Sequence, residues 1–237
     1  MAEATARAAN GLLNALTEDS WRAIEPYLEK HDLQHRDYIS RADERIEHLY
    51  FIESGWLSIL APGPAGLESE IGLLGREGMS GAPIVMGVAS SPFETFVQHE
   101  GYAHRIAVGD LQHVLKKDDG VRTTLLKFAH VMHVQSAFTA LANAHGKLEE
   151  RLARWLVMCH DRVAGDEMPL VHEFLALMLA VRRPGVTDAL HIIEGKGLIK
   201  ARRGQITVLD REGLIEHAAG FYGQPEKTYA GLFGAAA

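Results

Sequence analysis

Two pairs of arginines near turn-forming residues are the first feature of the chain that could do chemistry. Arg182 and Arg183 precede a Pro-Gly dipeptide, and Arg202 and Arg203 precede Gly204. Guanidinium groups bind phosphates and read guanine through paired hydrogen bonds. Residues 182–211 hold seven basic and three acidic side chains, whereas the whole chain carries a net charge of -7. The sequence therefore predicts a local basic site on an acidic protein and argues against a general nucleic-acid coat.

A short helix over residues 184–195 is predicted between the two arginine pairs. Proline stands at its start and glycine just past its end, as is common at helix boundaries. The spacing of its apolar residues gives it one face that packs on an apolar helix at 173–180. Two short helices joined by a tight turn form a helix-turn-helix unit. The predicted contacts place Val186, Leu190 and Ile193 against Leu175, Leu177 and Leu179.

The opposite face of the second helix is polar, and its first residues are those that reach base edges in helix-turn-helix proteins. Residues 198–209 then predict a hairpin with Arg203 and Gly204 near the tip and with Ile206 and Val208 facing inward. A basic hairpin tip beside a recognition helix would meet phosphates. The alternative is that the four arginines are only solvent-exposed residues of two turns. That alternative does not explain why they lie on both sides of a predicted helix-turn-helix unit. The predicted DNA-binding residues are Arg182, Arg183, Thr187, Asp188, His191, Arg202 and Arg203.

The first half of the chain has a different pattern. Residues 10–30 predict two short helices, the second capped by Thr17 or Asp19. Short β-rich runs over residues 33–108 are separated by glycines, among them Gly55 and Gly101, which are interpreted as turns. Many short strands with regular turn signals are typical of an antiparallel sandwich or jelly roll.

A long helix is predicted over residues 119–144, after a short helix capped by Asp110. About 25 residues at 1.5 Å per residue exceed what a small domain needs, so one apolar stripe is expected to meet a second subunit. A long core helix of a monomer is the alternative. The residues assigned to the dimer helix are Leu125, Phe128, Met132, Val134, Phe138 and Leu141.

Cysteine and histidine usage limits the metal and redox chemistry. Cys159 is the only cysteine, which excludes an intrachain disulfide and a thiolate zinc site, and its apolar helical surroundings predict a buried structural thiol. His130 and His133 have metal-compatible spacing on the long helix, but without a carboxylate in that turn they are interpreted as mainly structural. No apolar run is long enough to span a membrane, so a soluble cytoplasmic protein is expected.

At this point the sequence resembles the Crp/Fnr (cyclic-AMP receptor protein/FNR) family of transcription regulators, over residues 12–214. The resemblance rests on "HLYFIESGWLSIL", "KLEERLARWLVMCHDRV", "HEFLALMLAVRRPGVTDALHIIEGKGLI" and "RRGQITVLDREGL". It implies an α+β fold with a double-stranded β-helix (jelly roll, cyclic-nucleotide-binding-like) sensor domain over 1–118, a dimerisation helix over 119–145 and a winged helix-turn-helix over 146–237. It also implies a homodimer that binds a palindromic DNA site, with RNA polymerase as a further candidate partner.

The resemblance also assigns positions on the recognition helix. Arg183 matches the family's guanine-reading arginine. Pro184 stands where an acidic residue is usual, and Asp188 stands where a later basic contact falls. The target sequences of the best-known members therefore do not transfer to this chain.

The family's nucleotide cassette is altered in this sequence. It needs a Gly-Glu pair for the ribose and an Arg-Ser/Thr pair for the phosphate, whereas here Ala82 follows Gly81 and no Arg or Lys lies between Arg76 and Arg105. A buried phosphate without a cation is poorly compensated, although backbone amides could bind an anion weakly. The effector pocket is assigned to Gly81, Ala82, Ser90 and Ser91.

Three functions follow in order of preference. The first is a DNA-binding regulator whose effector is unidentified and is not a standard cyclic-AMP ligand, with no catalytic residue, metal or cofactor. The second is a cyclic-nucleotide-responsive regulator with a non-standard pocket. The third is a cupin-type metal enzyme, which would need a His-x-His pair followed by Glu in the sheet region, and none is present.

Overall fold

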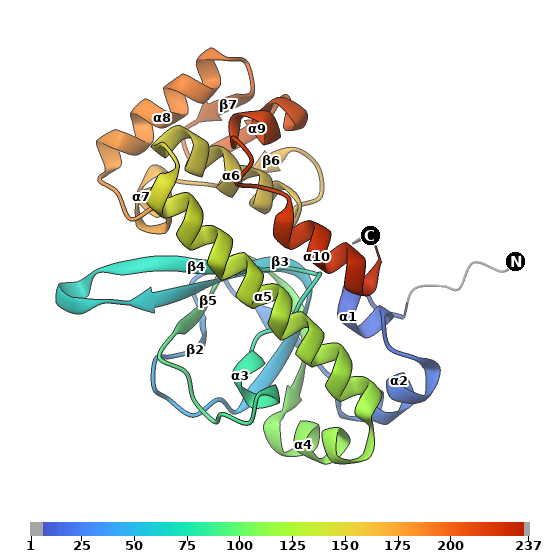
Figure 1. Ribbon diagram of the computed structural model, residues 1–237. Coiled ribbons are helices and arrows are strands. Elements are labelled where there is room, and N and C mark those ends of the chain that lie inside the picture. Colours follow the sequence, from blue (N-terminus) through green and yellow to red (C-terminus); the bar gives the residue numbers. More distant parts are fainter. Residues whose placement is uncertain (1–6, 235–237) are drawn as a thin grey trace, which may run out of the picture. The chain divides into compact units, whose positions relative to one another are not determined.

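The computed structural model describes residues 7–234, and the chain divides into two compact units. Of the described residues, 7–58, 74–133 and 228–234 belong to the first unit, and 59–73 and 134–227 belong to the second. The long helix that the sequence predicts between residues 119 and 145 is shared between the two units. Figure 1 shows the elements of both units.

The first unit is a β-roll with helices at its edge. Thr17 caps the second helix by accepting a hydrogen bond from Ser20 N–H, as predicted. Strands β1, β2, β3 and β5 pair in one antiparallel sheet, with β5 between β1 and β3 and with β2 also on β5. The elements are α1 (Gly11–Asn14), α2 (Glu18–Ile24), β1 (Glu29–Leu33), β2 (Tyr38–Ser40), β3 (His48–Pro62), α3 (Ala82–Val85) and β5 (Glu94–Ala107). Strand β4 (Glu68–Leu74) continues the sheet beyond β3.

Two glycines interpreted as turns lie inside strands, and this prediction was wrong. Gly55 lies within β3 at φ 77, and Gly101 lies within β5. A Cβ on Gly55 would meet the carbonyl oxygen of His99, and one on Gly101 would meet that of Ser54. The backbones of β3 and β5 therefore approach more closely at these positions than a residue with a side chain would allow. A glycine in this sequence pattern can thus mark a close backbone approach inside a strand instead of a turn. As a result, β3 and β5 each join two runs that the sequence pattern separates.

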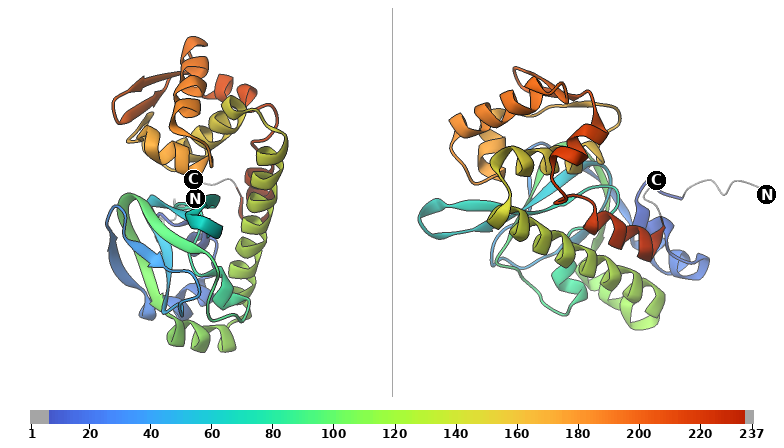
Figure 2. Two further views of the ribbon diagram at one scale, coloured as in Figure 1. Left: turned by 90° about the vertical axis from the view of Figure 1, so that its left-hand side faces the viewer. Right: turned by 45° about the horizontal axis from the view of Figure 1, so that its top comes forward.

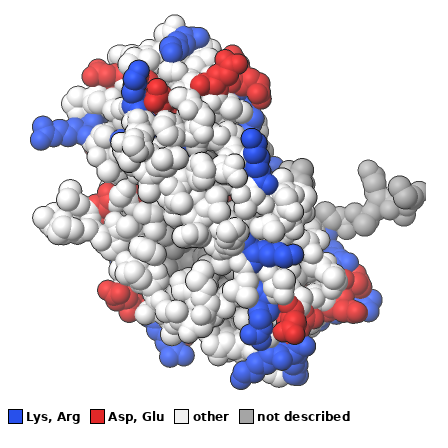
Figure 3. All heavy atoms as spheres, viewed as in Figure 1, with Lys and Arg blue, Asp and Glu red and all other residues white. Residues whose placement is uncertain are grey.

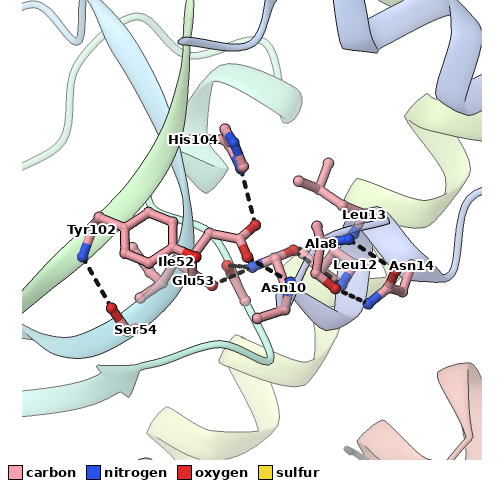
Figure 4. A network of polar contacts seen from close by, with 12 residues as sticks. Ala8, Asn10, Leu12, Leu13, Asn14, Ile52, Glu53, Ser54, Tyr102 and His104 are labelled. Carbon is pink, nitrogen blue, oxygen red and sulfur yellow. Dashed lines mark hydrogen bonds and ion pairs between the residues drawn. The ribbon is translucent and has the colours of Figure 1, made fainter. Parts of the chain in front are cut away.

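A buried polar cluster fixes the N-terminal segment on the sheet (Figure 4). Asn10 donates to the carbonyls of Ile52 and Gly78 at 2.9 and 2.8 Å and caps α1. Glu53, only 4% exposed, accepts from Ala9 N–H at 2.5 Å and pairs with His104 Nδ1 at 3.0 Å. Buried polar groups are stabilising only when they are paired, so this cluster specifies how the first helix meets the sheet.

Helix α5 (Asp119–His145) follows α4 (Val108–Lys117) and is the long helix in the views of Figures 1 and 2. Its residues up to His133 belong to the first unit. The N-cap of α4 is Ala107, not Asp110, which lies in the first turn instead. In the first unit Phe128 is buried against Gly78, where any Cβ would collide with its ring.

The second unit contains the C-terminal helices and a small sheet. Its elements are α6 (Leu148–His160), β6 (Glu167–Met168), α7 (His172–Met178), α8 (Arg183–Gly195), β7 (Ile199–Arg202), β8 (Gln205–Val208) and α9 (Arg211–His217). Helix α10 (Gln224–Phe233) ends the described chain. Cys159 is fully buried on α6, which confirms the structural thiol, and burial raises the pKa of its thiol group.

Charged side chains join the helices of this unit. Arg154 is 5% exposed and donates to Phe221 O and Thr139 Oγ1, both at 3.1 Å. Asp161 at the end of α6 accepts from Tyr222 Oη and from Arg211 of α9, both at 2.6 Å. These charge-assisted bonds hold α6 and α9 in one arrangement, so the framework behind the helix-turn-helix is fixed.

Candidate nucleic-acid interface

The turn between α7 and α8 closes by a C-terminal capping motif. Ala180 has a left-handed φ of 52, and Val181 N–H donates to Ala176 O at 2.9 Å. This six-to-one bond is typical of helices that end with a left-handed residue, which is usually glycine. An alanine in this conformation costs on the order of 1 kcal/mol. The turn is therefore formed in spite of the residue type at its centre.

Helix α8 buries the predicted face, and its exact limits differ from the prediction. It begins at Arg183, so that Pro184 is its second residue, and Gly195 lies inside its last turn. The left-handed residue after the helix is Gly197, with φ 74. Val186, Leu190 and Ile193 are at most 1% exposed, as predicted.

The contact predicted on α7 is partly wrong. Leu175 and Leu179 are buried, but Leu177 is 37% exposed and Met178 is buried in its place. The helix ends at Met178, two residues earlier than predicted. Because residues two apart on a helix point to nearly opposite sides, Leu175 and Leu177 do not share a face.

The polar residues predicted on α8 share its exposed side. Arg183, Asp188 and His191 are exposed and Thr187 is half-buried. Arg183 Nη1 donates to Glu173 Oε1 of α7 at 3.3 Å, while 64% of its side chain stays accessible. Thr187 Oγ1 lies 3.2 Å from His172 Nδ1. The first helix thus holds two side chains of the second.

The basic hairpin forms as predicted. Arg202 pairs with Gln205, so Arg203 and Gly204 are the two residues of the turn, and the positive φ of 78 falls on Gly204. Both arginines are exposed, while Ile206 and Val208 are buried. Strand β6 pairs with β8 and makes the hairpin a three-stranded sheet, and this third strand was not predicted from the sequence.

Three residues that matter to this geometry were missed. Glu173 and His172 contact α8 side chains, as described above, and Glu194 Oε1 accepts from Ala201 N–H at 2.9 Å, which joins α8 to β7. The sequence around Glu194 has helical periodicity and does not indicate that its side chain contacts Ala201, seven residues later. The contact becomes visible only when the end of α8 and strand β7 are placed side by side in the structure.

The electrostatics of the helix start favour an anion. The first turn of α8 contains no acidic residue, and helix N-termini carry partial positive charge. In Figure 3 the surface over the helix-turn-helix unit shows separate Lys and Arg groups with Asp and Glu between them. Such a surface supports contacts at defined points rather than a uniform basic field.

The residues assigned to the effector pocket contact neighbouring parts of the roll. Gly81, at φ 78, precedes α3, and a Cβ there would lie 2.7 Å from Leu49 Cγ. Ala82 is the first residue of α3. Ser91 Oγ accepts from Phe93 N–H at 3.2 Å, and Ser90 forms an isolated bridge with Arg45. Arg45 itself pairs with Glu47 at 3.5 Å.

The interior of the roll is apolar with a few polar groups. Ser58 Oγ donates to Gln98 Oε1 at 2.6 Å, and both residues are buried. The indole N–H of Trp56 is buried and has no hydrogen-bond partner among the described residues, and its ring lies 4.4 Å from His99. Arg105 is engaged by Glu29 at 3.1 Å.

The six residues assigned to dimer contacts fall into two groups. Leu125, Phe128 and Met132 are 1%, 1% and 9% exposed in the single chain, which leaves them little surface for a second subunit. Val134 and Phe138 are half-buried, and Leu141 is 44% exposed. A contact with a second copy would therefore use the other side of α5.

Two properties of the described chain concern membrane spans and metal sites. Among residues 7–234 no helix combines the length and the apolar character that a membrane crossing needs. In the same range no three His, Cys, Asp or Glu side chains lie close enough together to hold a metal ion.

Comparison with known proteins agrees with this geometry. Residues 150–217 match the family model of the Crp-like helix-turn-helix domain. No curated protein matches the chain in sequence.

Solved structures do match it in fold. The chain is similar to a protein from Eubacterium rectale described as a regulator of the crp/fnr family, with TM-score 0.70, 19% identity and coverage of 90% of this chain and 99% of that one.

Two further structures show the same fold. FixK2 from Bradyrhizobium japonicum gives a TM-score of 0.67 at 16% identity, covering 80% of this chain and 96% of that one. The c-di-GMP responsive regulator CLP of Xanthomonas campestris gives 0.64 at 15%, covering 81% and 99%. The α+β class, with a cyclic-nucleotide-binding-like region and a C-terminal helix-turn-helix, is therefore confirmed.

Proposed function

From a chain that has the Crp/Fnr regulator fold and a Crp-like helix-turn-helix domain, we propose a dimeric, sequence-specific DNA-binding regulator of transcription. The observation that carries the proposal is the exposed polar face of α8, which lies in the same compact unit as the basic β7–β8 turn. This function is one of binding and not of catalysis, and it places the protein in the cytoplasm with the DNA. RNA polymerase is a further candidate partner.

Contact with DNA would use the two arginine pairs differently. Helix α8 would enter the major groove with Arg183 on guanine, because this residue is exposed at the N-terminal end of the helix. Arg203 at the hairpin turn would contact phosphate, which fixes the register without reading sequence. Although Arg183 pairs with Glu173, 64% of its side chain stays accessible, so the guanidinium could reach a base edge.

The dimer would form through the exposed side of α5. The exposed residues of this side recur at alternating steps of four and three, which is the spacing of a two-stranded coiled coil. We name them the outer seam: Leu126, His130, His133, Ala137, Ala140 and Ala144. Two copies joined along this seam would set two α8 helices on half-sites about 34 Å apart.

The β-roll would sense an effector other than a standard cyclic nucleotide. Its cassette positions offer no cation, because no Lys or Arg lies between Arg76 and Arg105. Ser91, one of the two assigned hydroxyls, accepts a hydrogen bond within its own loop. A cyclic-nucleotide-responsive regulator with a non-standard pocket is the alternative. Calorimetry with cyclic AMP, cyclic GMP and c-di-GMP separates the two, since micromolar binding of any of them would favour the alternative.

The proposed function is tested by selecting bound fragments from random DNA with the full chain. We expect a two-fold symmetric motif with half-sites one helical turn apart, and sedimentation at the mass of two chains. Enrichment of no motif over bulk competitor, together with sedimentation as a single chain, would overturn the proposal.

A further inference from the structure

Two histidines occupy neighbouring positions of the outer seam. His130 and His133 are both exposed on α5 and make no hydrogen bond or ion pair with the described residues. They stand between Leu126 and Ala137 along the seam. In a two-fold dimer with parallel helices, each seam residue faces its own copy. The proposed dimer would therefore gather four imidazoles in two adjacent layers.

We propose that these four imidazoles, two from each copy, bind one divalent transition metal ion between the subunits, with zinc as the fitting ion. This inference rests on the proposed dimer. Imidazole is a good ligand for zinc, and structural zinc sites take four ligands in tetrahedral arrangement. Ligands three residues apart on one helix, facing ligands of another helix, are a known way of building a metal site in a helical bundle.

A single copy does not supply enough ligands. Among residues 7–234 no three potential ligands lie close enough to hold a metal ion. His130 and His133 give two nitrogens, and the second copy gives the other two. The site therefore exists only in the dimer, and binding of the ion adds free energy to association.

The polar ring nitrogens of the two histidines need partners once the seam is covered. Residues 120–148 contain no Asp or Glu, so α5 itself offers no carboxylate to accept from them. Imidazoles without hydrogen-bond partners would cost free energy in a coiled-coil seam. A metal ion bound by the ring nitrogens removes this cost.

The small residues after the histidines support close approach of the helices. Ala137, Ala140 and Ala144 carry only a methyl group each, so two copies of α5 can come near one another on that side. A short interhelical distance brings opposing imidazoles within reach of a common ion. The alanines alone would form a weak seam, which gives an added ion a larger share of the stability.

The experiment measures the dimer dissociation constant of the full chain by sedimentation, first in EDTA and then with zinc chloride at neutral pH. We expect zinc to tighten the dimer by about tenfold or more, with one zinc per two chains. His130→Ala and His133→Ala should each abolish the gain. Cobalt(II) should give the absorption of a tetrahedral ion in the original chain and not in these variants.

His145→Ala is the matched control, because His145 is exposed on the same helix but lies off the seam. It should keep both the zinc response and the stoichiometry. A dimer whose affinity is the same in EDTA and zinc overturns the metal site and leaves the proposed dimer standing. A chain that stays monomeric in both conditions contradicts the proposed function itself. Equal zinc binding by the histidine variants and the original chain also overturns the site.

Discussion

The winged helix-turn-helix and the β-roll differ in how many of the side chains expected for ligand contact they carry. On α8 the exposed polar face, the buried apolar face and the basic hairpin turn all lie where the sequence pattern predicts them. In the roll, Gly81 has a left-handed backbone before α3, but the next position carries Ala82, where the resemblance predicts a glutamate. The side chains expected for DNA contact are therefore present and exposed on α8, whereas those expected for a cyclic nucleotide are missing from the sequence of the roll. The comparison teaches that a shared fold does not by itself imply a shared ligand.

The largest effect should come from the buried face of α8. Ile193→Ala removes a fully buried side chain and should destabilise the second unit by about 2–5 kcal/mol, measured by chemical denaturation. Ile192→Ala, on the same helix but 44% exposed, should cost much less. Hydrogen exchange should locate the loss in residues 150–217 and leave the strands of the roll unchanged. Equal losses for the two variants would contradict the assigned faces.

Arg183→Ala tests whether the helix-turn-helix reads bases. It should weaken binding to the selected site by roughly 1–3 kcal/mol and relax one base position. Glu173→Gln, which keeps the size of the pairing partner, should weaken binding less and leave the base preference intact. Loss of affinity that is uniform over all sequences would show that Arg183 contacts only phosphate.

Arg203→Ala tests the contrasting role at the hairpin. Affinity should fall for every sequence alike, and the salt dependence should decrease by about one unit in slope. Filter binding at several salt concentrations measures this. If Arg203→Ala and Arg183→Ala behaved identically in the binding-site selection, the division between reading and positioning would be wrong.

Ala180→Gly addresses the turn that joins the two helices. Glycine tolerates the φ of 52 without a Cβ penalty, so the second unit should gain stability by up to about 1 kcal/mol. Thermal unfolding should show this gain with DNA affinity unchanged. A loss of stability would mean that the methyl group of Ala180 makes contacts that outweigh the strain.

The smallest effect concerns pH and the carboxyl group of Glu226. Burial raises the pKa of Glu226 above its ordinary value of 4.5, although Arg162 and Arg154 oppose the shift. The folded chain therefore holds this proton more tightly, and the stability gained is full below pH 4.5 and is lost as pH rises through the raised value. Glu226→Gln should show a smaller decline of stability between pH 4.5 and neutrality. An unchanged pH profile would contradict the assignment.

The sequence predicted local features well and contacts between distant segments poorly. Thr17 as a cap and Gly204 at a turn follow from chemistry confined to a few residues. The role of Gly55 depends on His99, which is brought near by strand pairing. Leu177 is apolar yet 37% exposed, because it lies nearly opposite the buried Leu175 on α7, and an apolar run does not show which of its sides will be covered.

The candidate site shows the same division. The residue types of the recognition face and its phase on α8 could be read from the spacing, since both depend on helical geometry alone. The ion pair between Arg183 and Glu173 joins two helices across a turn, and it could not be predicted from the spacing of residues within either helix. The free side of α5 was likewise hidden, because which stripe faces the roll is decided by the position of Gly78 beneath Phe128.

The carboxylate of Glu194 has a consequence for how the protein is adjusted. By accepting the Ala201 amide proton, it fastens the hairpin to the last turn of α8. A rotation of α8 would therefore tend to move the hairpin with it. If α8 reads bases and the hairpin contacts phosphate, as proposed, one rotation would change both contacts together.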